Sequence, residues 1–209
     1  LIAAGDENGN IVLWNGNGET LWSNKTPRTN WVFPPSFQYT NVVHLSPDGS
    51  SLVSALWDST LRLYDLRSGE IKKSVRNFAF FPQKSASSPN GNYLATQSID
   101  GIITVWDFKT GTILYQIEGQ LPSGSPFSND NQYLAIRISA STLKILRTED
   151  GVEIKTLYGH QNISTVQFSD AEHYLASGNM NDMHLWSMVS WQEIKGRKNF
   201  LANGCIVFN

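Results

Sequence analysis

The chain has 209 residues, of which 40% are apolar and 11% aromatic, so it is long and apolar enough to bury the core of one large all-β domain. This composition argues against a disordered chain. The formal net charge of −2 provides no strong field for nucleic acid or an anionic membrane, and we expect neither as a partner.

One hairpin unit recurs along the chain. Each copy is a short alternating strand, a turn that usually contains Gly, and a second strand. In chain order the copies are Gly9–Thr20, Ser59–Glu70, Gly101–Thr112, Ser141–Glu153 and the looser Asp182–Glu193.

The first strand of each copy ends on a large apolar or aromatic residue. These residues are Trp14, Tyr64, Trp106, Leu146 and Trp186, at successive separations of 50, 42, 40 and 40 residues. A period near 40 with internal hairpins is typical of four-stranded propeller blades. The repeat therefore predicts an all-β fold, a β-propeller of about five four-stranded blades.

A further pair of strands precedes each of the later hairpins. Asn41–Leu45 and Ser51–Ala55 flank the turn Ser46-Pro47-Asp48-Gly49. This turn recurs as Ser88-Pro89-Asn90-Gly91 and, in weaker form, at Ser128-Asn129-Asp130-Asn131. Pro, Asp or Asn, and Gly each favour a turn by a different mechanism, which supports four strands in each unit.

The third and last units follow the residue order of a WD repeat. The matching motifs are Ser88-Pro89-Asn90-Gly91, Leu94-Ala95-Thr96, Asp100 and Trp106-Asp107, and then Gly159-His160, Val166, Phe168, Leu175-Ala176-Ser177-Gly178 and Trp186. The chain therefore resembles the WD-repeat β-propeller family, with degenerate repeats.

The resemblance implies a structural tetrad of His, Ser or Thr, Asp and Trp within a blade. Its tetrad-like residues are His160, Ser177 and Trp186 in the last unit, and Thr96, Asp100 and Trp106 in the third. Neither set is complete, because Met180 occupies the Asp place in the last unit and Ala79 is near the His place in the third. Blade stability is then expected to come mostly from packing.

The repeat divides the single propeller into blade units. The expected units are residues 1–24 plus 201–209, 41–76, 77–118, 119–158 and 159–200, with an insertion at 25–40. Leu1–Gly5 matches a second strand and Gly204–Phe208 an innermost strand, so we expect the C-terminal strand to close the first blade. The alternative is a fragment of a larger propeller, since the chain lacks an initiating Met.

No pattern for catalysis occurs in the sequence. It contains no phosphate-binding loop, zinc-protease helix motif, paired-cysteine motif or nucleophile elbow, so we predict no catalytic residue, metal or cofactor. Cys205 is the only cysteine, which excludes an internal disulfide and favours a cytoplasmic protein. No apolar run approaches the roughly 18 residues of a membrane span.

The resemblance implies a non-catalytic scaffold that binds other proteins through the loop rim around the central channel. The alternative is small-ligand or carbohydrate binding, or an enzyme, at the channel mouth. The candidate partner-binding residues belong to the insertion, the later loops and the end of a second strand: Trp31, Phe33, Trp57, Arg76, Phe78 and Arg137. The insertion has a second interpretation, in which it packs over its own blade and plugs the channel.

Overall fold

A computed structural model describes residues 1–6, 10–25, 42–46, 49–55, 60–76, 82–169, 173–179 and 181–198. Within these ranges the secondary structure consists of strands, which form five successive sheets, and no helix. Apart from β12, the strands of each sheet pair antiparallel in chain order, as expected for repeated hairpins.

The first three sheets are antiparallel meanders. The first contains β1 (Ile2–Gly5), β2 (Asn10–Trp14) and β3 (Thr20–Lys25). The second contains β4 (Val42–Leu45), β5 (Ser51–Ala55), β6 (Thr60–Asp65) and β7 (Ile71–Arg76). The third contains β8 (Pro82–Ser87), β9 (Tyr93–Ser98), β10 (Ile102–Asp107) and β11 (Thr112–Glu118).

The last two sheets differ from this pattern in the strand β12. The fourth contains β13 (Tyr133–Arg137), β14 (Thr142–Arg147) and β15 (Glu153–Tyr158). The fifth contains β16 (Thr165–Phe168), β17 (Tyr174–Gly178), β18 (Asp182–Ser187) and β19 (Glu193–Lys198). β12 (Ser123–Ser125) precedes the fourth sheet in the chain but pairs parallel with β16 of the fifth.

The innermost strand of the fourth sheet is irregular, and the residues of this segment explain the irregularity. Gln120 and Phe127 still bridge to β13, but the residues between them leave that strand. Pro122 and Pro126 lie in this stretch and lack the N–H that a ladder requires. The segment therefore bulges towards the fifth sheet, and Gly124 at φ +89° allows close contact with the Val166 carbonyl.

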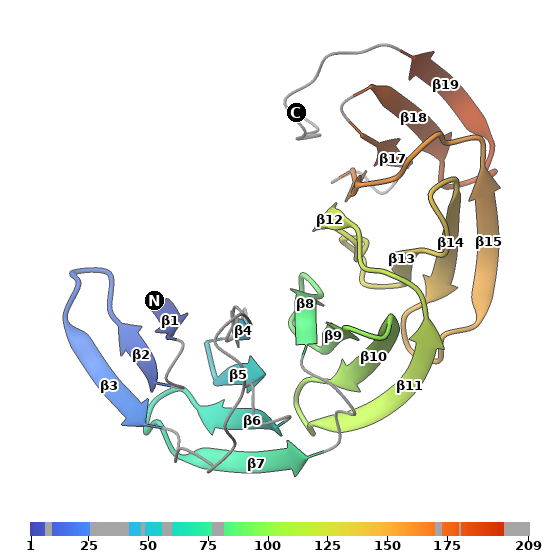
Figure 1. Ribbon diagram of the computed structural model, residues 1–209. Helices are drawn as coiled ribbons and strands as arrows, with labels where there is room; N and C mark the ends of the chain where they lie inside the picture. The colour runs from blue at the N-terminus through green and yellow to red at the C-terminus, as the bar shows by residue number, and fades with distance from the viewer. Residues whose placement is uncertain are drawn as a thin grey trace.

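The five sheets follow one another in an arc (Figure 1). β4, β8 and β12 lie on its inner side, and β3, β7, β11, β15 and β19 lie on its outer side. This all-β arrangement confirms the predicted propeller architecture. The first and last sheets lie at the two ends of the arc, and no strand pairing among the described residues joins them. The predicted closing strand Gly204–Phe208 lies outside the described residues and stays a prediction.

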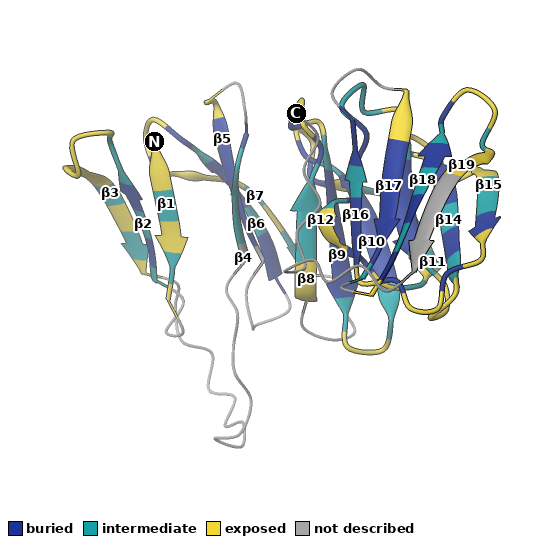
Figure 2. Ribbon diagram, turned by 90° about the horizontal axis from the view of Figure 1, so that it is seen from above, coloured by how far each residue is buried: buried dark blue, intermediate teal, exposed yellow. Residues whose placement is uncertain are grey.

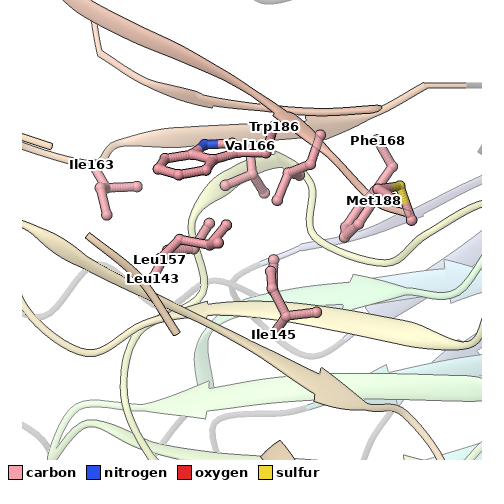
Figure 3. Close-up of a cluster of buried hydrophobic side chains, with 10 residues drawn as sticks. Leu143, Ile145, Leu157, Ile163, Val166, Phe168, Trp186 and Met188 are labelled. Atoms are coloured by element: carbon pink, nitrogen blue, oxygen red, sulfur yellow. The ribbon is translucent and has the colours of Figure 1, made fainter. Parts of the chain in front are cut away.

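The core lies between neighbouring sheets. In β2 the alternating positions Ile11 and Leu13 are fully buried, and they pack against Leu52 and Tyr64 of the second sheet. The corresponding layer between the fourth and fifth sheets is shown in Figure 3; the labelled residues are Leu143, Ile145, Leu157, Ile163, Val166, Phe168, Trp186 and Met188. Each sheet thus buries its apolar residues only by stacking on the next.

Candidate functional site

The sheets have two edges with different connections. The connection edge comprises the turns 99–101 and 138–141, between second and third strands, and the segments 119–121 and 159–163, which lead into inner strands. The hairpin edge comprises the turns 107–112, 147–152 and 187–192. In Figure 2 the connection edge is the lower one, towards which β1 runs.

Backbone bonds hold the connection edge together. Ile163 N–H donates to the Ala140 carbonyl at 2.9 Å, and Gly119 N–H donates to the Gly101 carbonyl at 2.8 Å. Each segment leading into an inner strand is therefore tied to a turn between second and third strands. The side chains on this edge are consequently attached to a backbone that these hydrogen bonds hold in place.

Two cations occupy this edge near the inner strands. Lys84 Nζ donates to the Leu121 carbonyl at 2.9 Å, and Arg137 Nη1 donates to the Ile163 carbonyl at 2.7 Å. Neither forms an ion pair with a carboxylate among the described residues. Partial burial, together with the positive charge of Arg137, lowers the pKa of Lys84.

Two isoleucines at this edge are exposed. Ile99 and Ile138 directly follow β9 and β13, in the turns between the second and third strands of neighbouring sheets. Their exposed fractions are 53% and 42%, although both are large apolar residues. Sequence reasoning missed Ile99, Ile138 and Lys84.

Of the six predicted partner-binding residues, the structure describes the side chain of Arg137 alone. Arg137 ends β13 on the connection edge, with its guanidinium on the Ile163 carbonyl. The backbone of Arg76 ends β7 on the same edge, opposite Thr60. Trp31, Phe33, Trp57 and Phe78 lie outside the described residues, so the predicted patch stays a prediction.

The last sheet contains a buried polar group built on one hydroxyl. Ser177 Oγ accepts the indole N–H of Trp186 at 2.8 Å and lies 2.6 Å from His160 Nε2. Burial, with the nearby His184, lowers the pKa of His160 to about 4, so this imidazole is neutral at pH 7. The three predicted tetrad-like residues therefore meet in one place.

Asp182 lies in this group but faces a second histidine. Its Oδ2 accepts the Gln161 backbone N–H at 2.9 Å, and its Oδ1 lies 3.1 Å from His184 Nε2. The His184 and His160 rings are 4.6 Å apart between centroids. Sequence reasoning did not include His184, because the pairing of β17 with β18 brings it there.

The third sheet repeats only the hydroxyl-to-indole bond. Trp106 Nε1 donates to Thr96 Oγ1 at 2.9 Å, and both side chains are buried. Asp100 lies in the exposed turn after β9, where its carboxylate accepts the hydroxyl of Ser98 and, at 3.4 Å, the Ile102 N–H. In this structure Asp100 therefore stabilises a turn.

The described part of the chain offers no cluster of three His, Cys, Asp or Glu side chains that could hold a metal ion. It also contains no helix long and apolar enough to cross a membrane. The buried group of the last sheet is enclosed within its blade, where Ser177 bonds His160 and Trp186. The connection edge is thus the candidate site, and it has the character of a binding surface.

The family model for the WD domain, G-beta repeat, matches residues 36–65, 73–107 and 151–186. Cross-pathway control WD-repeat protein 2 of Flammulina velutipes is 28% identical over 167 residues, which cover 73% of this chain and 53% of that protein. Small ribosomal subunit protein RACK1 of Caenorhabditis elegans is 27% identical over 131 residues, which cover 62% and 38% respectively. The chain thus spans about half or less of these relatives.

Solved structures agree on the fold. BamB from Moraxella catarrhalis has a TM-score of 0.69 at 18% identity, over 93% of this chain and 60% of that one. The C-terminal WD40 domain of Sif2 has a TM-score of 0.67 at 20% identity, over 94% and 54%. The three repeat matches show that the chain contains WD repeats like those of its sequence relatives, and the likeness to the solved structures shows the fold.

Proposed function

We propose that this chain is a non-catalytic scaffold that binds other proteins through its connection edge. The observation that carries the proposal is the exposure of Ile99 and Ile138 at equivalent turns of neighbouring sheets. Exposed apolar side chains next to an Arg are the combination that protein interfaces favour. Arg137 directly precedes Ile138 and supplies that cation.

The family supports the same function. WD-repeat proteins generally mediate protein–protein interaction and are generally non-catalytic. A relative at 31% identity over 148 residues, from Nematostella vectensis, is named Ribosome biogenesis protein WDR12 homolog, and RACK1 is named as a ribosomal subunit protein. Both names indicate work within macromolecular assemblies. The net charge of −2 favours a protein over a nucleic acid as the direct partner.

The sequence adds further residues to this proposed surface. Trp31, Phe33, Trp57 and Phe78 are predicted to lie in loops on the same edge, with Arg76 at the end of β7. Aromatic and Arg side chains often contribute most of the energy of an interface. These five residues stay predictions, because their side chains are not described.

The experiment compares the two edges of the molecule. Ile99→Asp combined with Ile138→Asp should remove captured proteins from an affinity purification read by quantitative mass spectrometry. Val189→Asp is the matched control, because Val189 is 84% exposed in a turn on the hairpin edge. Equal loss in both variants, or full retention in the double variant with an unchanged unfolding midpoint, contradicts the proposal.

A further inference from the structure

We infer that Lys84 and Arg137 together bind a carboxylate side chain of the partner protein, with an apolar partner residue next to it contacting Ile99 or Ile138. This inference rests on the proposed function and names the chemistry of the partner at that same edge. Four features of the described residues carry it: placement, unpaired charge, preorganisation and the apolar surroundings.

The fold brings the two cations to the same short segment. Lys84 belongs to β8 of the third sheet and reaches the carbonyl of Leu121. The preceding residue, Gln120, exchanges both backbone bonds with Arg137, at 2.8 and 2.9 Å. The Lys84 ammonium therefore contacts the residue next to the backbone partner of Arg137, and the positive charge of Arg137 acts on Lys84.

The charge at this place is not balanced by the described part of the chain. Other cations have acidic neighbours; for example, Arg147 Nη2 lies 2.6 Å from Asp150 and Lys144 Nζ 2.8 Å from Glu153. Lys84 and Arg137 instead bond to carbonyls, which carry no net charge. Each uses one donor in these bonds, while an ammonium has three N–H groups and a guanidinium five. Donors and charge remain for an anion.

The two donors are held before a ligand arrives. Leu121 N–H donates to the buried Gln97 Oε1 at 2.6 Å, which fixes the segment that Lys84 contacts. Arg137 is fixed at both ends, since its backbone pairs with Gln120 and its guanidinium bonds Ile163. A preorganised site loses less conformational entropy on binding, which raises the affinity for a given set of contacts.

The surroundings favour an acidic protein segment over a phosphate chain. Ile138 is the residue after Arg137, and Ile99 follows Gln97 by two residues. These exposed side chains can contact an apolar neighbour of the carboxylate but gain little from a solvated backbone of phosphates. The whole chain is also slightly negative, which opposes nucleic acid at a distance.

The test is an NMR titration of the full chain with two short peptides. The probes are acetyl-Leu-Glu-Leu-amide and acetyl-Leu-Gln-Leu-amide, which differ only in charge. We expect the Glu peptide to shift the Arg137 guanidinium and the 120–121 amides with at least about tenfold higher affinity than the Gln peptide. Raising NaCl from roughly 50 to roughly 300 mM should weaken the Glu peptide alone.

Variants distinguish the loss of a charge at this site from the loss of the fold. Lys84→Met changes an exposed side chain and should weaken the Glu peptide several-fold, whereas Arg137→Lys should keep part of the binding. Arg147→Met is the matched control, because that Arg already pairs with Asp150 on the hairpin edge. It should leave peptide affinity unchanged.

Three outcomes overturn the inference. They are equal affinity for the two peptides, retained affinity in Lys84→Met and Arg137→Met alike, or tighter binding of a hexathymidine oligonucleotide to the same resonances. If the peptides fail while Ile99→Asp with Ile138→Asp still abolishes capture, the carboxylate inference falls and the proposed scaffold stands. If capture is also unchanged, the proposed function falls with it.

Discussion

Trp186 donates its indole N–H to the hydroxyl of Ser177 over 2.8 Å, across two adjacent strands of the last sheet. In the third sheet Trp106 makes the same bond to Thr96 at 2.9 Å. A hydroxyl on the second strand thus satisfies the indole N–H of the third strand in both sheets. In the last sheet a histidine, His160, also joins this bond.

Ser177→Ala should destabilise the protein by about 1–3 kcal/mol, because it leaves Trp186 and His160 without their shared hydroxyl in a buried place. The measurement is urea unfolding at pH 7. Ser190→Ala, on the exposed hairpin of the same sheet, is the control and should change stability by less than about 0.5 kcal/mol. Equal effects of the two substitutions would show that the hydroxyl contributes nothing.

Stability should fall as the pH decreases from 6.5 to about 4. Burial, with His184 nearby, lowers the pKa of His160 to about 4, whereas an unfolded His takes up its proton near 6.5. Between these values the unfolded chain binds more protons than the fold, so acid favours unfolding. The loss from this group is at most about 3 kcal/mol.

The other groups around His160 define the control for this pH dependence. His184, Asp182 and Glu193 face it. Burial opposes the charge of Asp182, but the Gln161 N–H and His184 outweigh it, so the pKa of Asp182 lies below its ordinary value and outside this window. His160→Gln should reduce the slope of stability against pH, and part should remain because burial also lowers the pKa of His44. An unchanged slope would contradict the role given to His160.

Gly151→Ala should cost about 1–3 kcal/mol in the free energy of unfolding. Gly151 has φ +74°, which side chains rarely adopt, and a methyl group there would lie 2.7 Å from Cδ2 of the Tyr115 ring in the preceding sheet. The matched control is Gly18→Ala, in a hairpin turn of the first sheet, where φ is also positive (+82°) but nothing lies within 4 Å of the added methyl. Thermal unfolding of both variants tests whether the contact with Tyr115 prevents a side chain at position 151.

The predicted closure of the first blade can be tested with one disulfide. If Gly204–Phe208 pairs with β1 as β16 pairs with β17, Val207 lies opposite Ala3, in the places of Gln167 and Ala176. Ala3→Cys with Val207→Cys, in a Cys205→Ser background, should then form an intramolecular disulfide on mild oxidation, seen by mass spectrometry. Ser139→Cys with Val207→Cys is the control pair and should stay reduced; equal oxidation of both pairs argues against the closure.

Local sequence patterns were sufficient to predict the strands and their order. The alternation in β2 placed Ile11 and Leu13 on one face, and both are fully buried against the next sheet. Turn residues predicted the bounds of Ser51–Ala55 for β5. These features depend on neighbours a few residues away, which the sequence displays directly. The same periodicity placed Ser177 and Trp186 on one face of the sheet, two residues apart in register.

The sequence by itself therefore determined the repeat, the all-β propeller architecture and the hydroxyl-to-indole pairs. Only the tertiary structure decided that β12 pairs with β16, that His184 lies beside His160, and that Lys84 contacts the residue next to the backbone partner of Arg137. The physical reason is that these relationships depend on how strands and sheets stack and how far long side chains reach. A period of two along a strand encodes which face is buried, but it does not encode which residue of another strand lies opposite.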